Sequence, residues 1–577
     1  MPGPNVATKY VGFLCRNWRR ILTVAVPVAL CPILFNAGKE SRCLYGILLM
    51  VIYWAFELLP LSVTALLPVF IFPVLGVLTT SQTTAPYMKD IVMMFLAGMI
   101  LAIAVDYSNL HYRIALQTLL LLGTSISWVL FGLMIVTAFL SMWLSNTVTA
   151  LMVLPIFDAL TLEICRHISE LEYDGRHPVF SQWVPEARDS CKREFMSRAT
   201  PSVEIHATST TNPLRASTTI ERSLTRENVQ LRQAMLLGMA YATTIGGTGS
   251  LVGTPTNIVL YGLVQTRYPA ADRLSFATWM IYNVPPVLAR VVLTWFYVYY
   301  ILVPKCYHGH RADEFVVRYT IRRQYNDLGN ISFHEIMVLV IFAATVLLWF
   351  FRHPHIMQGW SCYFALGRAI GDATPSMLSV LLLALIPAKP FQCFSGPPLL
   401  EWSAIQRKLP WGIILLIGGS FSIVTASDAS GLAAKVASYL VSLDFMPDAL
   451  LVATMTSFTA IVTEFISNTA AAGIILPVSS DLAHSLKIHP FYMMIPIANA
   501  ASFSFMLPVG TPPNALIYHH GRMSTPYMAR AGFVVNVGCI LIELLFINTL
   551  GVWVFDLDEF PSWAEEINAT STMGHAK

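Results

Sequence analysis

Charged residues are scarce in this sequence. Asp, Glu, Lys and Arg together make up 12% of its 577 residues, whereas 55% are hydrophobic. A soluble globular domain carries about a quarter charged residues, so the composition excludes that class. Apolar stretches of bilayer-spanning length recur, for example from Ile21, Cys43 and Ile91, and we count about eleven to thirteen apolar elements. We therefore predict an all-α polytopic membrane protein with about 11 transmembrane helices.

Patterns typical of enzymes, metal centres and nucleic-acid binding are also missing. The nine cysteines are scattered without a CxxC pair, so we interpret them as core or loop thiols. The sequence has no glycine-rich phosphate loop, no dinucleotide fingerprint and no basic-aromatic pattern. An intramembrane hydrolase would need a base beside its nucleophile, and no motif supports one. We expect no catalytic residues, no organic cofactor and no nucleic-acid partner.

Basic residues are placed asymmetrically along the chain, which predicts the topology. Lys9, Arg16, Arg19 and Arg20 precede the first apolar stretch, and the segments 167–231 and 304–333 are rich in Lys and Arg. Basic loops stay in the cytosol, so these three segments are predicted to be cytosolic. The tail from Asp556 carries five acids and one base, and we expect it outside the cell. Its sequon at Asn568 is then a glycosylation site, whereas the sequon at Asn330 lies in a basic loop and stays unused.

A short polar motif occurs twice within apolar sequence. "SNTVTALMVLP" begins at Ser145 and "SNTAAAGIILP" at Ser467, and a hydroxyl residue, Ser141 or Thr463, stands four positions earlier in each case. A second motif, "GTPTN" from Gly253 and "GTPPN" from Gly510, follows each copy. Glycine follows serine by 108 residues in the first half and by 43 in the second, and the difference of 65 is the length of segment 167–231. The two halves are therefore in register.

Paired interruptions at corresponding places in two halves are typical of an inverted-repeat transporter. A Gly-Thr-Pro break frees backbone amides and carbonyls that lipid cannot satisfy, so it survives only where it lines a cavity or contacts a ligand. Exposed helix N-termini suit carboxylate or sulfate, and freed carbonyls and hydroxyls suit a hard cation such as Na⁺. Small polar residues also serve ordinary helix packing, but two copies of both motifs in one order favour a binding site. A channel is disfavoured because the duplicated break offers one occluded locus.

These motifs give the chain a resemblance to a known family. "YWAFELLPLSVTALLP" from Tyr53, "GGTGSLVGTPTN", "FISNTAAAGIILP", "SFMLPVGTPPNALIY" and "FPSWA" at its end resemble the divalent-anion/sodium symporter family of INDY type, nearly end to end. The resemblance implies a homodimer in the plasma membrane. Each protomer would have a scaffold domain and a transport domain with two re-entrant hairpins tipped by Ser-Asn-Thr. The implied function is uptake of citrate, succinate and related di- and tricarboxylates.

The resemblance also implies two sodium sites with a substrate site between them. The first sodium site would use Ser141, Ser145, Asn146 and Gly253, and the second Thr463, Ser467, Asn468 and Gly510. The substrate carboxylates would be held by Asn146, Thr147, Thr254, Asn468, Thr469 and Thr511. Because INDY relatives in insects move citrate without sodium, a sodium-independent citrate/proton or anion exchanger remains an alternative, as does a sulfate carrier.

We expect the chain to alternate between frame and transport segments. The early spans carry almost no polar ligand, which suits a stationary frame, whereas the hairpins and broken helices carry all of the predicted ligands and can travel together as an elevator. The predicted segments are a cytosolic N-terminus 1–20, scaffold 21–125, first hairpin 126–166, cytosolic loop 167–231, broken helix and span 232–303, cytosolic loop 304–333, scaffold 334–445, second hairpin 446–486, broken helix and last span 487–555, and extracellular tail 556–577.

Several charged or titratable residues within apolar stretches are further candidates, because burying a charge in a membrane costs at least about 2.5 kcal/mol. For Glu57 and Glu464 a structural ion pair or a helix end is the favoured interpretation. His519 and His520 would be proton sites in an exchanger, although an interfacial location is favoured. The remaining members of this group are Asp106, Asp158, Asp428 and Lys435.

Overall fold

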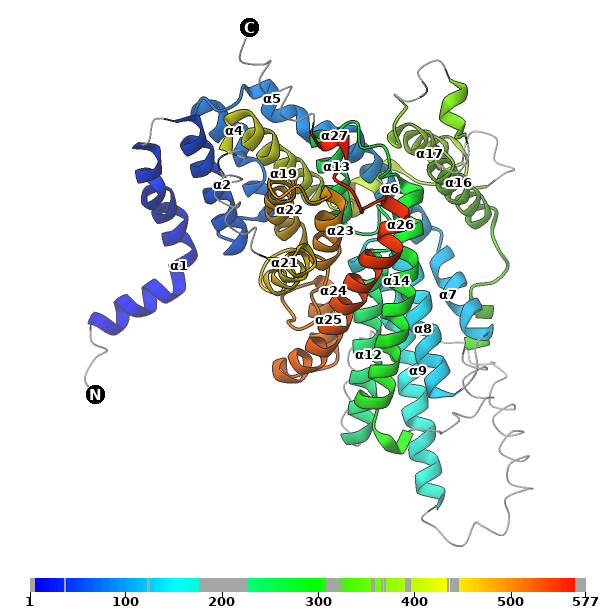
Figure 1. Cartoon of the computed structure of the whole chain (residues 1–577). Helices are drawn as coiled ribbons and strands as arrows, with labels where there is room; N and C mark the ends of the chain where they lie inside the picture. Colours follow the sequence, from blue (N-terminus) through cyan, green and yellow to red (C-terminus); the bar gives the residue numbers. More distant parts are fainter. Residues whose placement is uncertain are drawn as a thin grey trace.

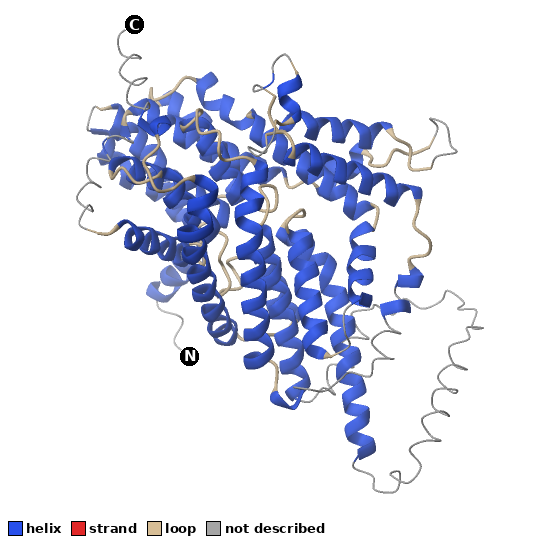
Figure 2. Cartoon of the chain, turned by 45° about the vertical axis from the view of Figure 1, so that its right-hand side comes forward, coloured by secondary structure: helices blue, strands red, loops and turns tan. Residues whose placement is uncertain are grey.

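The protein is described here from a computed structural model. It describes residues 6–35, 38–121, 125–175, 226–307, 321–323, 325–353, 358–364, 367, 370–389, 396–432, 435 and 446–565. Every regular element within these ranges is a helix, and Figure 2 shows no strand among them. The prediction of an all-α fold is therefore confirmed. The sequon at Asn568 and residues 176–225 of the predicted cytosolic loop lie outside the described residues.

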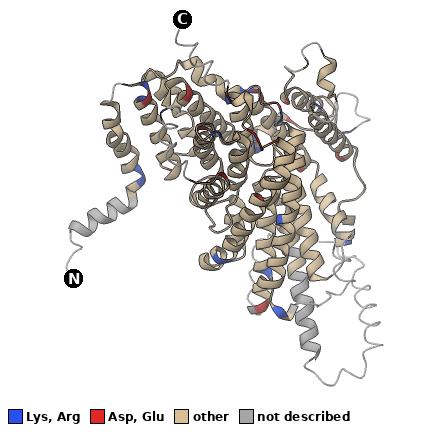
Figure 3. Ribbon diagram, in the orientation of Figure 1, with Lys and Arg blue, Asp and Glu red and all other residues tan. Residues whose placement is uncertain are grey.

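The helices have the length and composition of a multi-pass membrane protein. Six of those in the described ranges are long and apolar enough to cross a membrane, and five shorter helices are also apolar. Lys, Arg, Asp and Glu are sparse along the described ribbon, as Figure 3 shows. The helices before the first Ser-Asn-Thr hairpin are α1 (Val6–Leu30), α2 (Lys39–Ala55), α3 (Leu61–Thr64), α4 (Leu67–Val74), α5 (Thr80–Thr84), α6 (Asp90–Tyr107) and α7 (Leu110–Leu121).

The first repeat contains a hairpin, a broken helix and a long helix. Its hairpin is formed by α8 (Ile126–Ser141) and α9 (Asn146–Gly175), which meet at the Ser-Asn-Thr tip. The broken helix consists of α12 (Arg226–Gly247) and α13 (Pro255–Arg267), and α14 (Phe276–Tyr297) follows. Proline at the first helical position of α13 lacks the N–H that a helix start leaves unpaired, so Pro255 fixes where the second half begins.

The second repeat has the same order of elements. Helices α21 (Asp448–Val462) and α22 (Asn468–Ser485) form its hairpin, α23 (Pro490–Ala500) and α24 (Pro512–His520) its broken helix, and α25 (Thr525–Phe546) its long helix. Helix α24 again starts at a proline, with Thr511 as the capping residue. Between the repeats lie α16 (Phe333–Phe350), α17 (Ala373–Leu385), α18 (Trp402–Lys408) and α19 (Trp411–Ser430), and after them α26 (Val552–Phe555) and α27 (Ser562–Glu565).

The second half of each broken helix packs against the hairpin of the other repeat. Helix α12 packs on the first hairpin and α23 on the second, but α13 continues onto α22 of the second hairpin, while α24 lies against α9 of the first. Figure 1 shows α8, α9, α12 and α14 side by side, with α21, α22, α23 and α24 next to them. Most buried hydrophobic residues form one continuous cluster, and a second cluster joins α2 and α4 to α19. The two hairpins are therefore joined through the second halves of the broken helices.

Two element boundaries differ from the sequence-based expectation. The apolar stretch from Cys43 is interrupted: α2 ends at Ala55, and Glu57 turns the chain in a left-handed conformation with φ 46°. Pro60 then starts the next helical segment, because a proline and the residue before it disfavour a continuous helix. Helix α9 continues to Gly175, beyond the expected end of the hairpin at 166, because a change from apolar to charged side chains does not by itself end a helix.

Candidate functional site

The tip of the first hairpin brings three oxygen atoms together. Ser141 Oγ lies 2.9 Å from Asn146 Oδ1 and 2.7 Å from the carbonyl oxygen of Thr243, near the end of α12. A hydroxyl has one proton to donate, so it can satisfy only one of these two acceptors. The site therefore has a surplus of oxygen lone pairs, which is what a hard cation binds.

The second hairpin repeats this geometry with different residues. Thr463 Oγ1 lies 2.9 Å from Asn468 Oδ1 and 2.6 Å from the carbonyl oxygen of Ala501, near the end of α23. The hydroxyl side chains of Ser141 and Thr463 are fully buried, whereas Asn146 and Asn468 are half-buried at the tips. Each tip thus combines the predicted hydroxyl and asparagine with a helix-end carbonyl that sequence reasoning did not identify.

The motif serines lie at the same tips, where the second helix of each hairpin begins. Ser145 Oγ accepts a hydrogen bond of 3.4 Å from the Val148 amide, so it caps the start of α9. Ser467 is the capping residue of α22 and is half-buried, without a side-chain cap bond of that kind. In the sequence, each of these serines directly precedes the asparagine of its oxygen cluster.

The glycines of the two GTP motifs pack closely on the hairpin tips. A Cβ added at Gly253 would lie 2.9 Å from the Met142 carbonyl oxygen and 3.1 Å from that of Ser141. A Cβ at Gly510 would lie 3.5 Å from the Glu464 carbonyl oxygen and would collide with the Ser504 hydroxyl. At Gly253 only glycine leaves room for this approach, and in both halves the predicted backbone position lies beside the tip residues that carry or adjoin the predicted hydroxyl.

The asparagine that ends each motif holds the unwound segment before it. Asn257 Nδ2 donates to the carbonyl oxygens of Gly247 at 3.3 Å and Ser250 at 2.7 Å. Asn514 Nδ2 donates to those of Ser504 at 3.0 Å and Leu507 at 3.1 Å, at the same two spacings along the chain. These side chains replace the helical partners that the break removed. Their repetition in the two motifs was the available signal for this role.

Glu464 also holds the second unwound segment, by accepting hydrogen bonds from its backbone amides. Its carboxylate accepts hydrogen bonds from the amides of Phe505, Met506 and Leu507 at 2.8 to 3.1 Å, and one of 2.9 Å from Asn536 Nδ2. Glu464 is almost completely buried and directly follows Thr463, a predicted cation-site residue. Its partners among the described residues are neutral and include the Ser504 hydroxyl at 3.3 Å. Glu464 stands just after the end of α21, which matches the helix-end interpretation rather than the ion pair.

The predicted substrate residues stand at four helix starts. Thr147 and Thr469 lie in the first turns of α9 and α22, and Thr254 and Thr511 cap α13 and α24. A cavity of about 330 Å³ lies between α9 and α24 and is lined by Thr147, Leu151, Pro512, Ala515, Leu516 and His519. The first tip and the second broken helix therefore border a shared space, whose lining is apolar apart from Thr147 and His519.

The other charged or titratable candidates are not among the residues of the two tips. Asp158 on α9 pairs with Arg232 at 2.8 Å and with His520 at 2.9 Å. Asp106 pairs with Lys408 at the surface, Asp428 lies near the end of α19, and Glu57 is exposed in its turn. His519 lines the cavity described above, and Lys435 has contacts of its own.

The site lies within a region of the sequence that matches a known protein family. Residues 14–557 match the sodium:sulfate symporter transmembrane region. The chain belongs to the sodium:sulfate symporter family. The resemblance that the motifs carry is thereby confirmed, and the match includes both hairpins and both broken helices.

Named members of this family are similar to this chain over nearly their whole length. The chain is 35% identical to the Na⁺/dicarboxylate cotransporter 3 of Rattus norvegicus, covering 96% of this chain and 95% of the relative. It is also 35% identical to the Na⁺/citrate cotransporter of Rattus norvegicus, over 94% of this chain and 96% of the relative. The Protein I'm not dead yet of Drosophila melanogaster is 32% identical, over 99% and 95%.

Proposed function

We propose that the protein is a plasma-membrane secondary transporter that carries di- and tricarboxylates such as citrate and succinate together with Na⁺. The observation that carries the proposal is the duplicated oxygen cluster at the two hairpin tips. The hydroxyl, amide and carbonyl oxygens of each cluster suit Na⁺, and the neighbouring helix starts suit carboxylates. The names of two similar proteins, which state sodium and a dicarboxylate or citrate, support the same substrates.

Each predicted residue then has a defined role. Ser141, Ser145, Asn146 and the backbone of Gly253 hold one Na⁺, and Thr463, Ser467, Asn468 and the backbone of Gly510 hold the other. Thr147, Thr254, Thr469 and Thr511, with the two asparagines, orient the carboxylates between the ions. Moving a multiply charged anion through hydrocarbon is prohibitive unless its charge is neutralised, so bound Na⁺ is needed for the crossing as well as for the driving force.

The alternatives predict different ion dependence or substrates. A citrate/proton or anion exchanger would work without sodium, and a sulfate carrier would prefer sulfate over succinate. Neither is supported by the names of the two rat relatives, which state sodium with dicarboxylate or citrate.

The deciding experiment is uptake of radiolabelled succinate and citrate into proteoliposomes with an inward gradient of Na⁺ or of choline. We expect uptake only with Na⁺. Asn146→Ala and Asn468→Ala should each abolish most uptake because each removes an oxygen of one cluster. Asn548→Ala, which removes an exposed asparagine on α25's extension, should retain wild-type uptake. Uptake that is equal in choline, or a wild-type affinity in either tip variant, would contradict the proposal.

We further propose a homodimer with the N-terminus in the cytosol and the C-terminus outside. The basic start and the acidic tail with its sequon support this orientation. Asn568→Gln should remove a glycan-dependent shift on a gel, and Asn330→Gln should not. A C-terminal epitope that is accessible only after permeabilisation would overturn the orientation.

A further inference from the structure

A fully buried ion pair joins the two repeats at a distance from the hairpin tips. Arg290 on α14 pairs with Glu543 on α25, and both side chains have no solvent exposure. Removing two charges from water is costly, and a hydrophobic pair of the same size is often at least as stable. Stability alone is therefore a weak reason for this pair, and its other contacts indicate what it does.

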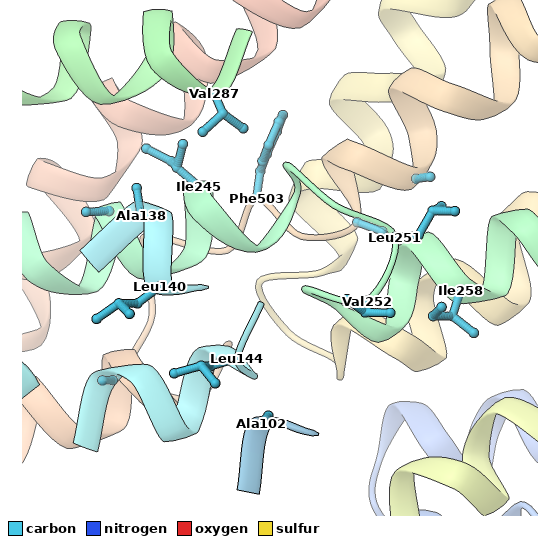
Figure 4. Packing of buried hydrophobic residues seen from close by; sticks show 14 of the residues in the cluster. Ala102, Ala138, Leu140, Leu144, Ile245, Leu251, Val252, Ile258, Val287 and Phe503 are labelled. Atoms are coloured by element: carbon cyan, nitrogen blue, oxygen red, sulfur yellow. The ribbon is translucent and has the colours of Figure 1, made fainter. Parts of the chain in front are cut away.

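Arg290 touches both unwound segments. Its Nη1 lies 3.4 Å from the Thr248 hydroxyl in the first segment, and its guanidinium lies 4.9 Å from the ring centroid of Phe503 in the second. Figure 4 shows Phe503 beside Ile245, at the end of α12, and Val287 on α14. The rigid, planar guanidinium of Arg290 thus contacts both unwound segments, shortly after the carbonyls of Thr243 and Ala501 that belong to the oxygen clusters.

Glu543 extends the contact to the second cation site. Its Oε1 accepts hydrogen bonds from Tyr282 at 2.9 Å and from Asn499 Nδ2 at 3.0 Å. Asn499 stands two residues before Ala501, whose carbonyl belongs to the second oxygen cluster, and Asn499 Nδ2 also donates to Asn283 at 2.8 Å. Arg290 connects to the first oxygen cluster through Thr248, because Thr248 follows Thr243, whose carbonyl belongs to that cluster, in the same chain segment.

We propose that Arg290 and Glu543 are positioning residues that couple the two sodium sites. The inference rests on the proposed sodium-coupled function. When Na⁺ orders the first unwound segment, Thr248 is held against Arg290, and the ion pair transmits this order to Phe503 and Asn499 beside the second site. Binding of one ion then prepares the other site, which gives positive cooperativity through a continuous buried network.

The test measures succinate uptake into proteoliposomes as a function of Na⁺ concentration. Arg290→Met/Glu543→Leu removes both charges while keeping the volume, so the protein should stay folded. We expect its half-saturating Na⁺ concentration to rise about fivefold or more and its Hill coefficient to fall toward one. The matched control is Arg113→Met/Glu335→Leu, which removes a buried pair between α7 and α16 that contacts neither unwound segment, and it should keep the wild-type Hill coefficient.

A second variant covers the case in which the double variant does not fold. Thr248→Val keeps the shape and the ion pair but removes the hydroxyl that Arg290 contacts, and it should also lower the Hill coefficient. A folded variant of either kind with the wild-type Na⁺ curve would overturn the inference and leave the proposed function intact. A wild-type protein whose uptake ignores Na⁺ would overturn the sodium coupling, and this inference with it.

Discussion

The residues that shape the site are in part different from those that would touch its ligands. Asn257 and Asn514 face backbone carbonyls, and Gly253 and Gly510 allow the close approach of the hairpin tips. These four positions explain why the GTP motif recurs as a unit. The glycine brings the segments together, the proline starts the new helix, and the asparagine satisfies the freed carbonyls.

The two motif glycines should differ in their tolerance of alanine. At Gly253 the added methyl would meet backbone oxygen, 2.5 Å from the Gly247 carbonyl, and backbone cannot rotate away. At Gly510 the collision is with the side-chain hydroxyl of Ser504, which can rotate away at the cost of its 3.3 Å hydrogen bond to Glu464. We expect Gly253→Ala to abolish uptake and Gly510→Ala to retain a large part of it. Uptake by Gly510→Ala/Ser504→Ala should match that of Ser504→Ala alone, and equal effects of the two glycine variants would contradict this prediction.

Loss of either motif asparagine should destabilise the protein. Asn257→Ala leaves the carbonyls of Gly247 and Ser250 buried without these partners, which costs about 1–3 kcal/mol for each stranded group. Thermal unfolding in detergent should therefore shift downward, and added Na⁺ should raise the midpoint less than in wild type. Asn257→Asp should be at least as damaging because a carboxylate oxygen would face a carbonyl. An unchanged midpoint in both variants would exclude this role.

At the scale of elements, the repeats share their geometry but hold their unwound segments by different chemistry. The second segment is bound by the carboxylate of Glu464. At the corresponding place in the first repeat stands Met142, and there the Ser250 hydroxyl donates to the Met142 carbonyl instead. The sequence predicted both hairpins and both breaks, but it did not predict this difference, because the partners of Glu464 are backbone amides far away in the chain.

Glu464→Gln should damage the second site selectively. An amide side chain can accept at only one of its two positions, so part of the set of backbone hydrogen bonds at 505–507 is lost. We expect a rise of about tenfold in the half-saturating Na⁺ concentration, measured by uptake, which corresponds to about 1.4 kcal/mol. The neighbouring exposed variant Phe465→Leu is the control and should stay close to wild type. Wild-type Na⁺ dependence of Glu464→Gln would contradict the assignment.

At the scale of the whole molecule, α19 lies between the early helices and the repeats. It packs against α2, α3 and α4 on one side and against α13 and α22 on the other. Gly262 and Gly473 let the two repeat helices approach Phe421 and Ser420 of α19 closely. If α19 belongs to a stationary frame, this is a surface along which the hairpins move.

A crosslink across that surface should stop transport. A Cβ at Gly473 would lie 3.0 Å from the Ser420 Cβ, so the two helices need to separate by less than about 1 Å to reach the Cβ–Cβ separation of about 3.8 Å in a disulfide. Oxidation of Ser420→Cys/Gly473→Cys should therefore abolish uptake, and a reductant should restore it. The two single variants, oxidised in parallel, control for the chain's own cysteines. Full uptake by the crosslinked protein would exclude movement of α22 past α19 and favour gating around a fixed site.

The sequence by itself determined the class of fold, the duplication and the family. Hydrophobic run length, proline and glycine breaks and repeated motifs are local properties, and they predicted the hairpins and half-helices directly. Only the tertiary structure decided which oxygens meet. Thr243 and Ala501 contribute through their carbonyls, which every residue has, and the pairing of Arg290 with Glu543 depends on how α14 and α25 pack. Such contacts depend on the packing of distant segments, and one sequence carries no local signal for them.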